Sequence, residues 1–141
     1  MLPFPHNDCA ELERLLNTLR LRYRRVLIVT EGLFSLDGDY PDLREMVRIK
    51  NKHKCKLFVD EAHSFGTLGA MGRGLCEHLG VDPKEVDVRI GTMSKTLASV
   101  GGFILGTSKL IAFLKASAGG FIFSVGVAPA TVPQLSKLSD S

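Results

Sequence analysis

Three side chains suited to proton transfer or covalent chemistry are the carboxylate of Asp60, the imidazole of His63 and the amine of Lys95. Asp60 directly follows the short apolar run 56–59, and Lys95 lies five residues after the end of a second run, 86–90. Runs of this length are typical of strands in a parallel sheet, and ligands bind beyond the carboxyl ends of such strands. The spacing therefore predicts that carboxylate, imidazole and amine meet at one edge of a sheet.

Pyridoxal 5'-phosphate (PLP) is a cofactor that needs this combination of groups. A carboxylate such as Asp60 keeps its pyridine nitrogen protonated, so that the ring can act as an electron sink. Its aldehyde needs a lysine, here Lys95, and His63 can donate a hydrogen bond to its phenolic oxygen. Its phosphate needs hydroxyls and free backbone N–H groups, which Thr92 and Ser94 offer in the turn before the lysine.

Each of these residues alone also has an ordinary structural interpretation. Asp60 is then a cap or an ion-pair partner, His63 a structural histidine and Lys95 a solvated surface lysine. The letters DEAH that begin at Asp60 also occur in one helicase group, but those proteins need a GxxxxGK[ST] loop upstream, which this chain lacks. The glycines between Gly66 and Gly74 do not have the spacing of a dinucleotide-binding loop. Only the combination of residues favours PLP.

The elements that must position these groups alternate between strands and helices. The sequence predicts a capped helix from Asp8 to Leu19, a helix after Pro41, a helix at 108–115, the start of another near Pro129, strands at 26–30, 56–59, 86–90 and 102–106, and an extended segment at 121–123. This order predicts an α/β fold, a three-layer domain around a mostly parallel sheet. Continuous apolar runs further predict strands buried on both faces. At 141 residues the chain is expected to form a single domain, 1–141.

Composition excludes several other classes of protein. The net charge of +3 is mild and basic residues are not interleaved with aromatics, which argues against nucleic-acid binding. No apolar run reaches membrane-spanning length and no secretory signal is present, so we expect no membrane segment. Cys9, Cys55 and Cys76 form no CxxC pair, which predicts no metal site and unpaired thiols in a reducing, cytoplasmic environment.

Several segments resemble the α-oxoamine synthases, which are PLP-dependent enzymes of fold type I. The resembling segments occur in the same order as in that family and cover nearly the whole chain: His6–Asp8, Glu31–Gly38, Val59–Gly66, Gly72–Gly74 and Gly91–Lys95. The resemblance implies that the chain is part of the large domain of the PLP-dependent transferase fold. It also implies a reaction that condenses an amino acid with an acyl-CoA to an α-amino ketone, in most members with loss of carbon dioxide.

The resemblance also implies a role for individual residues. Asp60 pairs with the pyridinium, His63 and Ser35 lie at the phenolic oxygen, Thr92 binds the phosphate, and Lys95 forms the Schiff base and then transfers protons. Members are homodimers or heterodimers with active sites at the interface, and the segment Phe121 to Ser124 resembles the stretch that reaches the partner's phosphate. Where many members have a threonine, this chain has Val125, so Ser124 is the candidate for that contact.

Other parts of the family pattern have no counterpart in this sequence. These are the upstream glycine-rich phosphate loop, the histidine that stacks on the ring, and the small C-terminal domain with its carboxylate-binding arginine. The resemblance thus implies the C-terminal half of the PLP-binding large domain, without the upstream segment and the small domain. Segment Leu97–Phe103 and the Gly32-Leu33 step favour a serine palmitoyltransferase-like member. The alternatives are a non-catalytic or incomplete subunit, and an aminotransferase or aldolase of the same fold.

Overall fold

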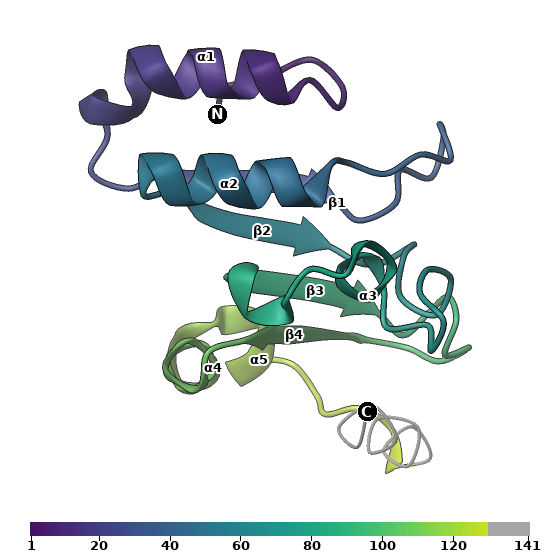
Figure 1. Cartoon of the computed structure of the whole chain (residues 1–141). Helices are drawn as coiled ribbons and strands as arrows, with labels where there is room; N and C mark the ends of the chain where they lie inside the picture. The colour runs from purple at the N-terminus through teal and green to yellow at the C-terminus, as the bar shows by residue number, and fades with distance from the viewer. Residues whose placement is uncertain (130–141) are drawn as a thin grey trace.

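The computed structural model describes residues 1–129 of the chain as an alternating series of helices and strands (Figure 1). Its elements are α1 (Cys9–Leu19), β1 (Leu27–Glu31), α2 (Leu43–His53), β2 (Lys56–Asp60), α3 (Leu75–Leu79), β3 (Val88–Thr92), β4 (Gly102–Gly106), α4 (Ser108–Ser117) and α5 (Gly119–Ile122), with short 3-10 turns at Arg20–Arg22 and Pro83–Glu85. The helix expected near Pro129 falls largely outside the described residues.

The four strands form one sheet in the order β1-β2-β3-β4. β1 pairs with β2 and β2 with β3 in parallel, whereas β4 runs antiparallel to β3. The predicted α/β class and mostly parallel sheet are therefore confirmed. Because β1, β2 and β3 are parallel, their carboxyl ends lie at one edge of the sheet, where ligands bind in open α/β folds.

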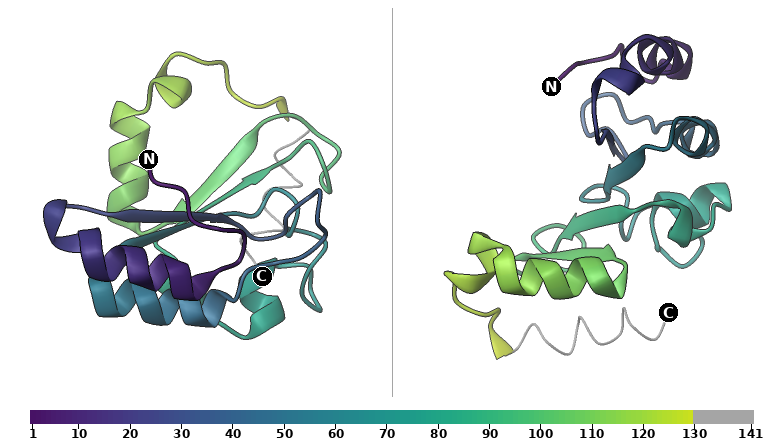
Figure 2. Two further views of the ribbon diagram at one scale, coloured as in Figure 1. Left: turned by 90° about the horizontal axis from the view of Figure 1, so that it is seen from above. Right: turned by 90° about the vertical axis from the view of Figure 1, so that its left-hand side faces the viewer.

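Helices cover the two faces of this sheet unequally. Figure 2 places α1, α2 and α3 on one side of the sheet and α4 on the other. The core lies on the first side, where Leu43, Met46 and Ile49 of α2 are buried together with Leu57 and Val59 of β2. Each fully buried aliphatic side chain contributes about 1.5–3 kcal/mol, so this layer is the main source of stability.

The prediction that the strands are buried on both faces is wrong for β1. Its residues alternate, with Ile28 buried while Leu27 and Val29 are 51% and 55% exposed. An apolar run shows that a strand has two apolar faces, but it does not show that another layer covers each of them. The β1 face opposite α1 and α2 is uncovered in the described part of the chain.

The segment predicted to be extended at 121–123 instead includes the end of the short helix α5. The amides of Phe121 and Ile122 donate to the carbonyl of Ala118, at 2.9 and 3.0 Å. Aromatic and β-branched residues favour strands only where a neighbouring strand can pair with them. Within residues 1–129 no strand pairs with this segment, and its backbone bonds locally instead.

None of the helices in the described range has the combination of length and hydropathy that crossing a bilayer requires.

Candidate active site

The predicted site residues Asp60 and Thr92 end neighbouring strands at the same edge of the sheet. Asp60 closes β2 and Thr92 closes β3, and the parallel register pairs Asp60 with Ile90. Side chains alternate along a strand, so Asp60, Ile90 and Thr92 belong to one face of the sheet. Leu57 and Val59 lie on the opposite face, under α2. The carboxylate and the hydroxyl therefore lie on the face away from the core.

A tight turn after β2 brings the predicted imidazole to the predicted amine. The amide of Phe65 donates to the carbonyl of Glu61 at 2.9 Å, which closes the turn around His63. Nε2 of His63 lies 2.8 Å from Nζ of Lys95, although the two residues are 32 positions apart. Oδ1 of Asp60 accepts from the amide of Ala62 at 2.9 Å, which fixes the carboxylate at the base of the turn.

Lys95 extends from a loop that is fastened at its base. The amide of Met93 donates to the carbonyl of Gly101 at 3.0 Å, and the amide of Ser99 donates to the carbonyl of Met93 at 2.8 Å. Met93 is fully buried, whereas Lys95 is exposed. A fixed backbone thus presents a long, flexible amine to the edge of the sheet.

Two hydroxyls lie together beside this loop. Oγ of Ser94 is 2.7 Å from Oγ1 of Thr92, and the amide of Ser94 donates to the same Thr92 oxygen at 3.2 Å. Hydroxyls at a tight turn are groups that bind phosphate oxygens. The edge therefore combines an acid, an imidazole, an amine and a pair of hydroxyls, which suits a ligand with an aldehyde, a basic ring and a phosphate.

Comparison with known proteins assigns the chain to a family. A profile of the family described as aminotransferase class I and II matches residues 1–140. This chain belongs to that family. Among curated members, 8-amino-7-oxononanoate synthase of Treponema denticola is 45% identical over 92% of this chain and 32% of its own length. Serine palmitoyltransferase of Bacteriovorax stolpii is 42% identical over 97% of this chain and 32% of its own length.

A solved structure that is similar to this chain has the same fold. The structure of serine palmitoyltransferase from S. paucimobilis with a bound PLP–myriocin aldimine superposes with a TM-score of 0.84 at 33% identity, covering 95% of this chain and 34% of that one. The chain therefore spans about a third of the length of the relatives it matches. The predicted PLP-dependent transferase fold is confirmed.

Two predicted site residues are not brought to this edge by any contact among residues 1–129. Ser35 lies in an exposed turn after β1, and Ser124 donates its hydroxyl to the carbonyl of Gly120 within the α5 region, at 2.5 Å. Neither hydroxyl is in hydrogen-bond contact with Lys95 or His63 in the described structure. Their proposed contacts with a cofactor stay predictions.

Glu61 is a buried residue of the site that the sequence marks only as the second letter of the DEAH motif. The residue is 3% exposed, and its Oε2 accepts from the hydroxyl of Ser64 and from the amide of Leu75. The sequence feature that could have indicated its role is an acidic residue between Asp60 and His63, ahead of a glycine-rich loop. A buried carboxylate must find donors, so this position was a candidate for an internal anchor.

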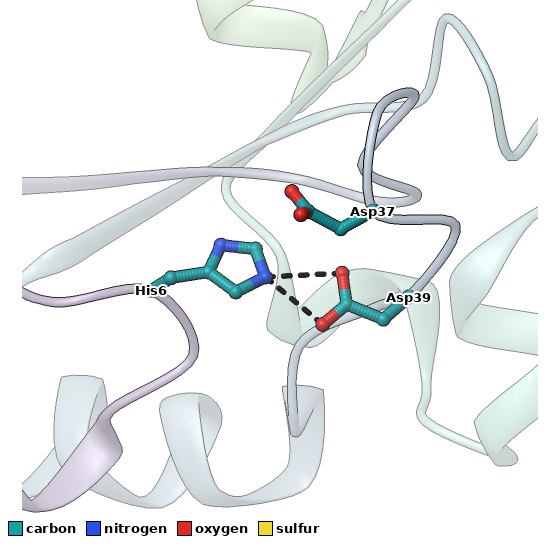
Figure 3. A group of neighbouring side chains, drawn as sticks. All are labelled: His6, Asp37 and Asp39. Atoms are coloured by element: carbon teal, nitrogen blue, oxygen red, sulfur yellow. Dashed lines mark hydrogen bonds and ion pairs between the residues drawn. The ribbon is translucent and has the colours of Figure 1, made fainter.

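A second polar cluster joins the segment before α1 to the loop after β1. Figure 3 shows the imidazole of His6 facing the carboxylate of Asp39, with Asp37 beside them. His6 Nε2 is 2.9 Å from Asp39 Oδ2, and Nδ2 of Asn7 donates to the same oxygen at 2.8 Å. His6, Asp37 and Asp39 each have a ligand-type atom within 4.8 Å of the others, the spacing of a metal site. Asp39 already has two protein partners, His6 and Asn7. We therefore interpret the cluster as a structural contact that holds the segment before α1 against the loop after β1.

The cysteines are poor nucleophiles in this fold. All three are free thiols, and burial raises the pKa of Cys76 to about 11. Burial also raises the pKa of Cys9 and of Cys55. A thiol with a raised pKa is almost fully protonated at neutral pH, so the reactive amine at the sheet edge is the better candidate for covalent chemistry.

Proposed function

We propose that this chain supplies the PLP-binding edge of an acyltransferase that condenses an amino acid with an acyl-CoA to an α-amino ketone. The observation that carries the proposal is the 2.8 Å approach of Lys95 Nζ to His63 Nε2, beside Asp60. The solved relative with a bound PLP adduct supports the same cofactor, and the names of the curated relatives support the reaction class.

The residues at the edge fit the cofactor group by group. Lys95 would hold its aldehyde and afterwards move a proton at the reacting carbon. Asp60 would hold the proton on the pyridine nitrogen, since a neighbouring anion favours the charged ring. His63 would donate to the phenolic oxygen together with Ser35. The bound cofactor would supply the electron sink that stabilises a carbanion at the amino acid.

The phosphate would lie at the paired hydroxyls. Thr92 and Ser94 would donate to its oxygens, and Ser124 would donate from a second subunit. The exposed side chains of Phe121 and Phe123 support such an interface, because large exposed apolar groups mark association surfaces. We therefore propose a homodimer or a heterodimer with the active site between subunits.

Among the possible members, we propose a serine palmitoyltransferase-like enzyme with serine and a long-chain acyl-CoA as substrates. The Leu97–Phe103 segment supports this subtype, and it runs from the lysine loop into the start of β4. Three free cysteines support a reducing compartment, and we propose the cytoplasm.

Borohydride trapping tests the cofactor. The purified chain is incubated with less than one equivalent of PLP and reduced, and the modified lysine is then mapped by mass spectrometry. We expect the label on Lys95 and its loss in Lys95→Arg, while Lys109→Arg, a change at an exposed lysine of α4, retains it. Label spread evenly over exposed lysines, or unchanged in Lys95→Arg, would contradict the proposed role.

A chimera tests the reaction. This chain replaces the corresponding third of Bacteriovorax stolpii serine palmitoyltransferase, and release of CoA thiol is measured with serine and palmitoyl-CoA. We expect release that depends on Lys95 and is absent from the Lys95→Ala chimera. A chimera that binds PLP but releases no more CoA than Lys95→Ala would refute the acyltransferase assignment.

A further inference from the structure

Glu61 lies between two predicted cofactor contacts but is itself enclosed by protein. Asp60 and His63 are partly exposed at the sheet edge, whereas Glu61 is 3% exposed. A buried carboxylate is costly unless several donors satisfy it. Its position and its burial together suggest that Glu61 acts on its neighbours rather than on a ligand.

One oxygen of Glu61 joins two separate segments. Oε2 accepts from the hydroxyl of Ser64, which is fully buried, and from the amide of Leu75, the first residue of α3, at 3.0 Å. The backbone of Glu61 adds a third attachment, because its amide donates to the carbonyl of Ile90 in β3 at 2.7 Å. The turn after β2 is thus anchored to α3 through the side chain and to β3 through the main chain.

The surrounding glycines show how closely these segments pack. A Cβ on Gly74 would collide with the Glu61 carboxylate, and a Cβ on Gly32 would collide with Oγ of Ser64. The loop after β1 and the loop before α3 therefore both close on the Glu61–Ser64 pair. Such close packing leaves the pair little room to move without shifting a backbone.

The anchored turn contacts the lysine loop as well. Oγ1 of Thr96 donates to the carbonyl of Phe65 at 2.9 Å, and Gly66 packs directly against the Thr96 side chain. A rotation of the turn would therefore change both the direction of His63 and its distance from Lys95.

We propose that Glu61 is a positioning residue that holds Asp60 and His63 in the orientation the cofactor ring requires. This inference rests on the proposed function. Because Glu61 is enclosed by protein, its proposed role is exerted through Asp60 and His63 and not through contact with the cofactor. It fixes the turn from inside the protein, so that the pyridine partner and the phenolic-oxygen partner keep a constant separation and direction.

The test compares Glu61→Gln with Glu77→Gln in the full chain. Glu77 is a matched control, because its carboxylate also accepts backbone amides of the glycine-rich loop, from Met71 at 3.0 Å and Arg73 at 2.9 Å. We measure the apparent dissociation constant of PLP from trapping at Lys95. We also measure the imidazole Cε1–H resonance of His63 in the cofactor-free chain, since a change in denaturation midpoint alone would not reveal a positioning role.

Glu61→Gln is expected to raise the PLP dissociation constant about tenfold, the equivalent of weakening one buried charge-assisted hydrogen bond. It is also expected to move the His63 resonance. Glu77→Gln should change the constant by less than about twofold and leave the resonance in place. Ser64→Ala, which keeps the carboxylate and removes one donor, should shift both readouts in the same direction by a smaller amount.

Two negative results are distinguishable. If the unmodified chain forms no adduct at Lys95, the proposed function fails and the inference fails with it. If the unmodified chain forms the adduct, but Glu61→Gln binds PLP as tightly and leaves the His63 resonance in place, only the positioning role of Glu61 is refuted. Equal effects of Glu61→Gln and Glu77→Gln would also refute it, because they would reflect general support of the loop.

Discussion

Replacing Gly74 by alanine tests whether the loop before α3 is closed against Glu61. Gly74 has φ +89° and ψ −159°, a region that only glycine populates readily, and an added Cβ would also lie 2.9 Å from Cδ of Glu61. The backbone conformation costs alanine about 1–3 kcal/mol. Displacing the carboxylate from the Leu75 amide costs a further ~1–3 kcal/mol. Together these effects lower the free energy of unfolding by about 4 kcal/mol.

Urea denaturation followed by circular dichroism measures this loss, which corresponds to a midpoint lower by roughly 2 M. Gly38→Ala is the matched control, because Gly38 has φ +70° and no atom within 4 Å of an added Cβ. That change carries only the left-handed backbone cost of about 1–2 kcal/mol. In a Glu61→Ala background, Gly74→Ala should lose the part of its excess over Gly38→Ala that comes from the collision with the Glu61 carboxylate. If Gly74→Ala is no more destabilising than Gly38→Ala in the natural background, the packing argument is wrong.

Two further predictions concern the covered face of the sheet and the charges on its helices. Leu57→Ala, on the covered face, should lower the free energy of unfolding by about 2–5 kcal/mol in urea denaturation. Leu27→Ala, on the uncovered face, should change it by less than about 0.5 kcal/mol. Equal losses would show that both faces are covered. Hydrogen bonds from Arg48 and Lys52 lower the pKa of Glu13 to about 2. This contribution to stability is complete above the ordinary glutamate pKa of about 4.3 and is lost as the pH falls towards 2. The denaturation midpoint should fall over that interval, and the fall should be smaller in Glu13→Gln; identical pH profiles would refute the assignment.

The elements predictable from sequence are those with local signals. Asp8 caps α1 by accepting from the Glu11 amide at 2.8 Å, as the sequence predicts, and α3 ends at Gly80 in a left-handed conformation that glycine adopts readily. The strand positions are also predictable, although β3 begins and ends two residues later than expected. Strand ends then follow from the parallel order of the sheet, which is why Asp60 and Lys95 could be assigned to one edge without coordinates.

What the sequence could not supply depends on partners that are distant in the chain. The exposure of Leu27 and Val29 is set by which layers are present above β1, and an apolar run contains no such information. The two donors of Glu61 come from different segments, so no single stretch of residues predicts its role as an anchor. The cofactor contacts of Ser35 and Ser124 come from the family resemblance alone, and no contact among residues 1–129 tests them.

The antiparallel strand β4 explains why the lysine can serve this edge. A parallel connection after β3 would have carried the chain away through a long crossover, whereas an antiparallel return keeps both ends of the loop at the same edge. The residues between Thr92 and Gly102 therefore form a closed loop whose base is held by hydrogen bonds between Met93 and Gly101 and between Ser99 and Met93. The backbone at Lys95 is held in place while its long side chain stays flexible. An amine needs both properties if it is first to bind the cofactor ring and then to release it and transfer a proton. The chemistry proposed for this edge thus depends on β4, which runs antiparallel to β3.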